Sequence, residues 1–120
     1  MLFTIWLIEL KIWSDSIDLC VDVYQALANM PNDERYGLSS QIKRSAVSIP
    51  SNIAEGAGRD TNSQFSHFLN IAYGSSYELQ TQLIISERLN FISSEVNESL
   101  LNKLNEVQKM VYVFKENINK

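Results

Sequence analysis

Residues 35–59 of the chain read RYGLSSQIKRSAVSIPSNIAEGAGR. Apolar side chains recur there at three- and four-residue spacing, which predicts a helix with one buried face: Leu38, Ile42, Ala46, Ile49 and Ile53. Pro50 lies inside this helix, where it removes an N–H donor and clashes with the preceding turn at a cost of about 3 kcal/mol. The opposite face carries small polar residues instead of the lysines and glutamates of a solvated helix. We therefore expect another surface to pack against it.

The composition predicts one folded domain. A chain of 120 residues is long enough for a single core, and its 45% apolar and 20% charged residues argue against disorder. Four Gly and two Pro leave room for few turns, so we expect few, long elements. The net charge of −4 argues against a surface that is basic all over and coats nucleic acid.

The single cysteine and the apolar N-terminus bear on the compartment. Cys20 excludes an internal disulfide, fits a reducing cytoplasmic environment and, on an apolar stripe, reads as a small buried side chain. No run reaches the ~20 apolar residues of a membrane span, so we expect no membrane association. Residues 1–9 are apolar but lack the features of a signal peptide. We interpret them as an N-terminal extension that continues or precedes the first helix, with disorder or a misassigned start as alternatives, and residues 10–120 as the domain.

A first helix is expected from about Leu10 to Asn29, and it carries two apolar stripes. The longer stripe, which we assign to the core, comprises Leu10, Trp13, Ile17, Cys20, Tyr24 and Leu27. A second stripe lies beside it: Ile12, Leu19, Val23 and Ala26. Two stripes exceed what one bundle needs, which favours burial both within the bundle and against another subunit.

We expect the helix that contains Pro50 to be entered through Gly37, with Ser39 or Ser40 as its cap, and two more helices follow it. One begins with a capping box at Thr61 and Gln64 and continues to about Leu89, with Gly74 in its middle, where we expect close approach of another backbone. Its core stripe is Phe65, Phe68, Leu69, Ala72, Ser76, Leu79 and Leu83, and Tyr73, Tyr77, Ile84 and Ile85 lie off it. The last helix, capped by Ser93 or Ser94, has a regular stripe: Leu100, Leu104, Val107, Val111, Phe114 and Ile118. Without any alternation typical of strands, the pattern predicts an all-α protein, an antiparallel up-down four-helix bundle.

The residues of common catalytic and metal sites are missing from the sequence. His67 is the only histidine, so a histidine-pair metal site cannot form, and we interpret it as a surface or boundary residue. Glu55, Glu78 and Glu87 lack the Glu-x-x-His pattern of di-iron bundles. We therefore predict no catalytic residues, no metal and no cofactor, and hence a protein that is not an enzyme.

The polar face of the helix that contains Pro50 is the candidate functional surface. It comprises Gln41, Arg44, Ser48, Ser51, Asn52 and Glu55. One interpretation is a tight helix–helix or subunit contact held by hydrogen bonds; the other is a recognition surface for a partner protein or RNA. Arg44 and Glu55 are eleven residues apart, about 16 Å along a helix, so each needs a partner on another helix, another chain or a ligand.

Basic residues in and around the same helix are candidates for RNA contacts. They are Arg35, Lys43, Arg44 and Arg59. Ordinary solvated charges explain these four residues as well as phosphate contacts do.

Residues 34–56, ERYGLSSQIKRSAVSIPSNIAEG, closely resemble the signature of the bacterial four-helix bundle proteins called 23S rRNA-intervening sequence proteins. Residues 10–13 (LKIW), 72–75 (AYGS) and 78–83 (ELQTQL) resemble the family's first and third helices. The resemblance covers about residues 10–118. The accessory protein of diversity-generating retroelements belongs to the same superfamily.

The resemblance implies an antiparallel bundle that assembles as a ring-like homopentamer, which would account for the second apolar stripe and the off-stripe aromatic residues. Family members have a largely undefined molecular role. The retroelement branch binds reverse transcriptase and nucleic acid and tends to be basic, whereas this chain carries −4. We therefore expect a non-enzymatic oligomeric protein of the intervening-sequence type, an interaction scaffold. The alternative is an RNA- or reverse-transcriptase-binding accessory protein.

Overall fold

The computed structural model describes residues 10–34 and 37–118. The described residues fold into helices only, which confirms the all-α prediction, and none of these helices is long and apolar enough to cross a membrane. The extension expected at residues 1–9 lies outside the described residues. The elements in chain order are α2 (Lys11–Ala26), the short 3₁₀ turns η1 (Leu27–Asn29) and η2 (Asn32–Glu34), α3 (Leu38–Ala57), α4 (Asn62–Arg88) and α5 (Ser94–Ile118).

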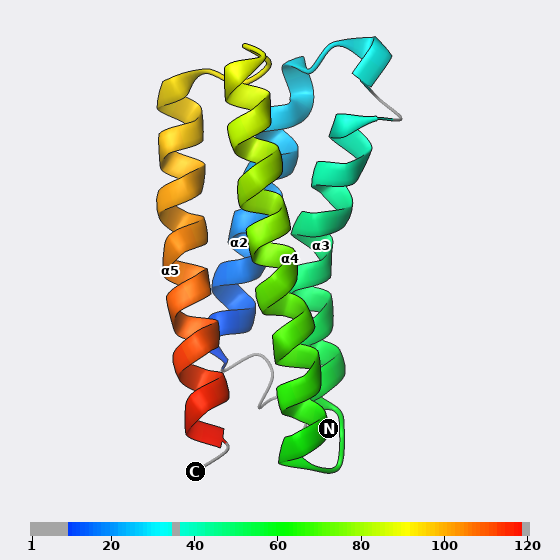
Figure 1. Ribbon diagram of the computed structural model, residues 1–120, viewed down its shortest axis with the longest axis vertical. Coiled ribbons are helices and arrows are strands. Elements are labelled where there is room, and N and C mark those ends of the chain that lie inside the picture. The colour runs from blue at the N-terminus through cyan, green and yellow to red at the C-terminus, as the bar shows by residue number, and fades with distance from the viewer. Residues whose placement is uncertain (1–9, 35–36, 119–120) are drawn as a thin grey trace.

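The four α-helices form an antiparallel up-down bundle (Figure 1). Each helix runs opposite to the one before it, because every connection between them is short. α2 packs against α3 and α5, and α4 also packs against α3 and α5, so α2 and α4 occupy opposite corners. The contact between α3 and α4 is the most extensive of the four. The predicted bundle is therefore confirmed.

Three of the four predicted core stripes lie in the core, and the assignment on α2 was reversed. Its inner line is Ile12, Ser16, Leu19 and Val23, whereas Trp13, Ile17 and Cys20 are half-buried and Tyr24 is 43% exposed. Ser16 explains the error. Its hydroxyl donates to the backbone oxygen of Trp13 at 2.8 Å, so a polar side chain can occupy a core position that hydrophobicity alone reads as a gap.

α3 continues as a helix through Pro50, which is buried. Because Pro50 has no N–H, the carbonyl of Ala46 loses its usual partner one turn later. The packed environment on both sides of the helix outweighs that local cost. Propensity is a weak constraint where most of a helix's stabilisation comes from tertiary packing.

The helix caps agree with the sequence at two of the three predicted starts. The Thr61 hydroxyl accepts the Gln64 N–H at 3.1 Å and starts α4, and the Ser93 hydroxyl accepts the Val96 N–H at 3.2 Å and starts α5. The prediction that Ser39 or Ser40 caps α3 was wrong. Gly37 is the N-cap residue there, without a side-chain cap, and Ser39 is buried in the first turn.

The glycines serve packing more than backbone conformation. A Cβ on Gly56 would lie 2.7 Å from Phe65 Cδ1 and 2.8 Å from Phe68 Cβ, so only glycine lets α3 and the start of α4 approach this closely. Gly58, the C-cap residue, has φ −85° and needs no glycine for its conformation. The close approach predicted at Gly74 is absent from the described residues, since a Cβ there would meet nothing within 4 Å.

Gly56→Ala is expected to destabilise the bundle by about 1–3 kcal/mol, because the new methyl group overpacks the Phe65–Phe68 contact. Chemical unfolding followed by circular dichroism measures the change. Gly58→Ala is the matched control: its Cβ would lie 3.7 Å from the nearest atom, the Glu55 oxygen, and we expect no loss of stability. Equal losses at both positions would contradict the packing role of Gly56.

The α4–α5 connection is closed by Asn90, the only non-glycine with positive φ among the described residues, at 62°. The Asn90 N–H donates to the Glu87 oxygen at 2.9 Å, and the Phe91 N–H donates to the Ser86 oxygen at 2.9 Å. These two bonds form a Schellman motif with Asn90 at its left-handed position. The turn brings Ile92 back into the core, where it is 5% exposed.

Asn90→Gly is expected to raise the free energy of unfolding by a few tenths to about 1 kcal/mol, since glycine has no steric penalty at positive φ. Asn90→Ala is expected to lower it by about 1 kcal/mol. Thermal unfolding of the two variants beside the parent checks the order Gly, Asn, Ala. Any other order would show that the left-handed residue does not limit stability at this turn.

Candidate functional site

The polar face of α3 divides between the α4 contact and the solvent. Ser48 and Asn52 belong to the contact: the Ser48 and Ser75 hydroxyls are hydrogen-bonded at 2.8 Å, which joins α3 to α4. Asn52 Nδ2 donates to the backbone oxygen of Ser48 at 2.8 Å and to its hydroxyl at 2.9 Å. These small polar side chains permit close helix approach and satisfy one another's hydrogen bonds.

A second polar link between α3 and α4 involves Ser45, which the sequence interpretation missed. Ser45 is buried, and its hydroxyl lies 3.1 Å from the Gln41 backbone oxygen and 3.0 Å from Glu78 Oε1. Gln82 Nε2 also donates to Glu78 Oε1, at 3.2 Å. The available signal was a serine directly beside the apolar face at Ala46, a position that favours a residue buried against a neighbouring helix.

The other members of the face, Gln41, Arg44, Ser51 and Glu55, are exposed. The expectation that Glu55 needs a partner from another element was wrong, because Arg59 Nη2 pairs with Glu55 Oε1 at 2.5 Å, one turn further along the chain. Both side chains are about half exposed (43% and 54%), so this pair contributes at most about 1 kcal/mol. Across residues 10–34 and 37–118, Arg44 has neither a hydrogen bond nor an ion pair.

The basic residues considered for RNA contacts do not form one cluster. Arg35 lies outside the described residues, and Lys43 is half-buried with its ammonium 5.3 Å from the centre of the Tyr24 ring on α2. Arg59 stacks over the Phe68 ring at 4.8 Å. Arg44 and Arg59 are fifteen residues apart, about 22 Å along a helix. Lys43 and Arg44 are consecutive residues of α3, and Arg59 lies beyond the end of that helix, so the structure does not gather the described charges into one patch.

The described residues contain no group of three or more His, Cys, Asp or Glu side chains that could hold a metal ion. His67 is exposed, and its ring packs edge-on against Phe68 at 5.3 Å. Cys20 is half-buried, and burial raises the pKa of its thiol, which disfavours the reactive thiolate. None of these side chains forms a recognisable set for acid–base or nucleophilic chemistry.

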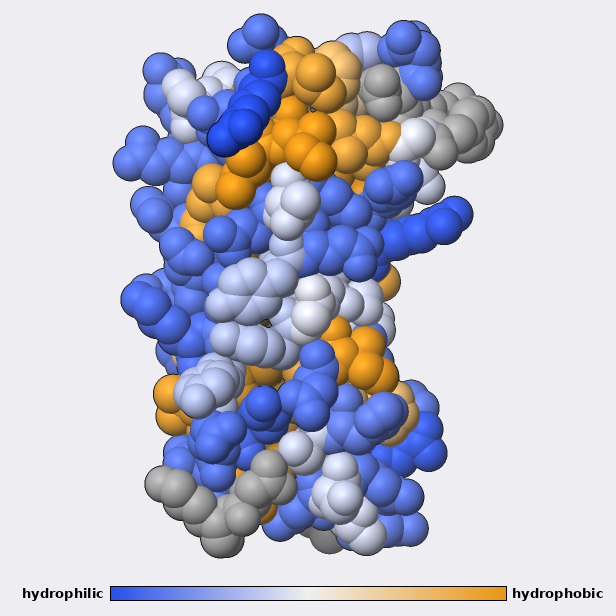
Figure 2. All heavy atoms as spheres, in the orientation of Figure 1, coloured by the Kyte–Doolittle hydropathy of each residue, from blue (hydrophilic) through white to orange (hydrophobic). Residues whose placement is uncertain are grey.

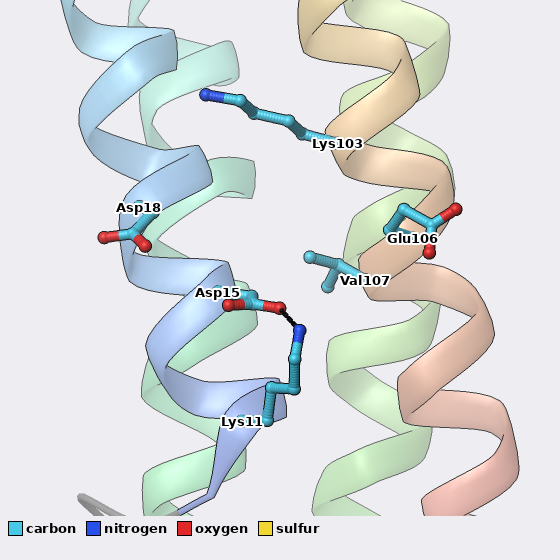
Figure 3. A pocket seen from close by; sticks show the side chains of 6 residues that line it. All are labelled: Lys11, Asp15, Asp18, Lys103, Glu106 and Val107. Carbon is cyan, nitrogen blue, oxygen red and sulfur yellow. Dashed lines mark hydrogen bonds and ion pairs between the residues drawn. The ribbon is translucent and has the colours of Figure 1, made fainter.

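A hollow of ≈ 270 Å³ between α2 and α5 is lined mainly by charged residues (Figure 3). Lys11 pairs with Asp15 at 2.6 Å, and this bond raises the pKa of Lys11. Lys103 extends from α5 toward α2, where it pairs with Asp22, and Val107 points into the space between the helices. Because these charges largely compensate one another, the hollow serves the α2–α5 contact and has no strong preference for a charged ligand.

An aromatic cluster on the α4–α5 side was not predicted as a unit. Tyr73 packs edge-on against Tyr77 at 5.1 Å, and its ring lies 6.0 Å from that of Tyr112 on α5. The Tyr73 and Tyr77 hydroxyls are 3.2 Å apart, and this hydrogen bond raises the pKa of Tyr73. The sequence marked Tyr73 and Tyr77 as lying off the core stripe, but no local pattern linked them to Tyr112.

This arrangement defines a class: a four-helix bundle whose polar residues mainly join its own helices, with no recognisable catalytic centre among the described residues. The family model described as "23S rRNA-intervening sequence protein" matches residues 8–113, so the chain belongs to that family. Among curated proteins, none matches the chain. A solved structure from Bacteroides thetaiotaomicron, a protein of unknown function from the S23 ribosomal protein family, is 26% identical, with a TM-score of 0.81 over 88% of this chain and 95% of that one.

Ser48→Ala is expected to lower the free energy of unfolding by about 1 kcal/mol, because Ser75 and Asn52 both lose a hydrogen-bond partner at the α3–α4 contact. Urea unfolding measures the loss. Ser51→Ala, three residues further along the same helix, is the matched control, since Ser51 is exposed and bonds to no described residue. We expect it to be neutral within about 0.5 kcal/mol. A neutral Ser48→Ala would show that the hydrogen bond contributes nothing to the contact.

Proposed function

We propose that the protein is a non-enzymatic, cytoplasmic interaction scaffold that works as a homo-oligomer. The observation that carries the proposal is an uncovered apolar strip on the outer side of α2 and α3. The strip comprises Trp13, Ile17, Val21, Tyr24 and Val47. With Cys20 as its single cysteine, the chain has no internal disulfide, which fits a reducing compartment.

The strip is continuous and open to solvent. On α2 its members follow one another at intervals of three and four residues, along a single side of the helix. Val21 is 49% exposed, Tyr24 43% and Val47 41%, although the core of the bundle is complete without them. The Lys43 ammonium over the Tyr24 ring places Tyr24 beside α3, one turn from Val47. Contiguous exposed apolar side chains of this kind mark interaction sites.

A second copy of the chain is the partner that we propose for the strip. A bundle of this length gains little by leaving three apolar side chains exposed and two half-buried along one strip unless another surface covers them. Membership of the 23S rRNA-intervening sequence family adds support, and a ring of five subunits is the assembly implied by the resemblance. A scaffold of this kind needs repeated copies of one surface, and it needs no catalytic group.

The alternative function, an RNA- or reverse-transcriptase-binding accessory protein, stays a prediction. It rests on Arg35, Lys43, Arg44 and Arg59. Of the three in the described part of the chain, Lys43 is engaged by Tyr24, Arg59 by Glu55 and Phe68, and only Arg44 is exposed and unpaired. Dispersed charges of this kind give the scaffold more support than the alternative.

Size-exclusion chromatography with multi-angle light scattering tests the proposal at micromolar concentration. We expect a single oligomer for the parent chain, and a shift to monomer for Val21→Glu, because an interface would have to bury an unpaired carboxylate. Circular dichroism should show that the variant stays folded, since Val21 is half exposed in the monomer.

Val113→Glu is the matched control: it introduces the same charge at a position 55% exposed on α5, outside the strip. We expect it to keep the parent's oligomeric state. If Val113→Glu dissociates the oligomer and Val21→Glu does not, the interface lies elsewhere. A monomeric parent chain would refute the proposed function itself.

A further inference from the structure

The tyrosine cluster between α4 and α5 forms a surface pocket, here called the tyrosine site. Its volume is ≈ 340 Å³, within the range of small-molecule pockets. The site is lined by Tyr73, Tyr77, Asn105, Gln108, Lys109 and Tyr112. Figure 2 shows the α4 side of the molecule, where apolar atoms gather near the upper end and in smaller groups lower down, among hydrophilic and intermediate atoms. The site is formed by tyrosines, amides and a lysine of α4 and α5, so it differs from the apolar strip of α2 and α3 in both place and chemistry.

The rings of the site are held in place and still accessible. Tyr73 is half-buried and contacts both other rings, edge-on to Tyr77 and tilted by 42° to Tyr112. Tyr77 is 47% and Tyr112 48% exposed, so each presents ring surface to solvent. Because neighbouring helices fix all three tyrosines, a planar ligand can stack without first ordering them.

The charge around the rings is positive, in a chain whose net charge is −4. No lining residue carries a carboxylate. Lys109 is exposed and, within the described parts of the chain, has no hydrogen bond or ion pair. The Lys115 ammonium lies 5.8 Å from the Tyr73 ring centre and 5.6 Å from that of Tyr112. Because the Lys115 ammonium also donates to Asn70 Oδ1 at 2.9 Å, Lys109 is the cation of the site that an anionic group on a ligand would meet.

Two side-chain amides, those of Asn105 and Gln108, also line the site and add polar groups to its rings and lysine. Asn105 supplies a side-chain amide with both donor and acceptor atoms. Gln108 is only 6% exposed, and its Nε2 donates to Gln80 Oε1 at 2.9 Å, which orients the amide beside the site. Amides in such positions can hydrogen-bond the edge of a nucleobase.

We propose that the tyrosine site binds a nucleotide, with the base stacked on Tyr77 or Tyr112 and the phosphate at Lys109. Stacking on aromatic side chains beside cations is how proteins bind unpaired bases. A free mononucleotide and a nucleotide within single-stranded nucleic acid share this chemistry. The site is formed by α4 and α5, whereas the apolar strip lies on α2 and α3, so it shares no residue with the proposed oligomer interface.

Two probes separate the two sources. The full chain is titrated with 5′-AMP and with a ten-nucleotide oligoadenylate RNA, and the NMR signals of the tyrosine rings are followed. We expect the Tyr77 and Tyr112 ring signals to shift with at least one probe. Binding of the oligonucleotide at least tenfold tighter than 5′-AMP, with strong salt dependence, identifies single-stranded nucleic acid as the ligand, and similar affinities identify the mononucleotide.

Matched variants test the roles of ring and charge. Tyr112→Leu is expected to weaken binding about tenfold, whereas Tyr112→Phe, which keeps the stacking ring, should bind within about twofold of the parent. Lys109→Gln should weaken binding several-fold. Lys103→Gln removes an equal charge from α5 at a lysine that pairs with Asp22, and it should leave binding unchanged.

Three outcomes would overturn the proposal. The first is the absence of ring shifts at millimolar 5′-AMP and saturating oligonucleotide. The second is equal weakening by Lys109→Gln and Lys103→Gln, or equal shifts with inorganic polyphosphate, which would reduce the effect to general charge attraction. The third is ring shifts that follow only protein concentration, which would make this face a contact between copies. None of them depends on the light-scattering result for the apolar strip.

Discussion

The close contact between α3 and α4 is the constraint on which the rest of the bundle depends. It is possible only because the facing residues are small: the phenylalanines at the start of α4 leave no room for a side chain at Gly56. Where the backbones approach this closely, water has less access to their polar side chains, which bond across the contact, as Ser48 does with Ser75 and Ser45 with Glu78. Close packing and hydrogen bonding are therefore two consequences of the same choice of residues.

This contact also decides which surfaces are left for function. Ser48 and Asn52 are hydrogen-bonded at the α3–α4 contact, so the α3 polar face is not a uniform recognition surface. Only the residues on its outer edge are exposed to solvent. Two other surfaces remain uncovered: the apolar strip of α2 and α3, and the tyrosine site of α4 and α5. They lie on different sides of the bundle and differ in chemistry, since one is apolar and the other combines aromatic rings with lysines. A scaffold can use such surfaces for different partners.

The polar residues inside the bundle show why hydrophobicity patterns assign faces imperfectly. On α2 the longest apolar stripe is half-buried, and the true inner line includes Ser16, whose hydroxyl is satisfied by its own helix. Asn97 on α5 is fully buried and donates to Glu87 at 2.9 Å, which joins α5 to the end of α4. Such residues have polar side chains but lie in the core. A pattern that counts only apolar side chains passes over them.

The sequence by itself determined the helices, most of their caps, the antiparallel bundle and the family, because helical periodicity, capping residues and a long signature are all local properties of the chain. The sequence also indicated that the residue types of common catalytic and metal sites are missing, since it has a single histidine and no Glu-x-x-His pattern. Only the tertiary structure decided which α2 stripe faces inward, that Glu55 pairs with Arg59, and that Lys43 lies over the Tyr24 ring. The tyrosine site belongs to the same group, since Tyr73 and Tyr112 are thirty-nine positions apart and meet only through the packing of α4 on α5. Contacts between helices depend on the rotation and approach of each helix, and these are set by the whole core at once.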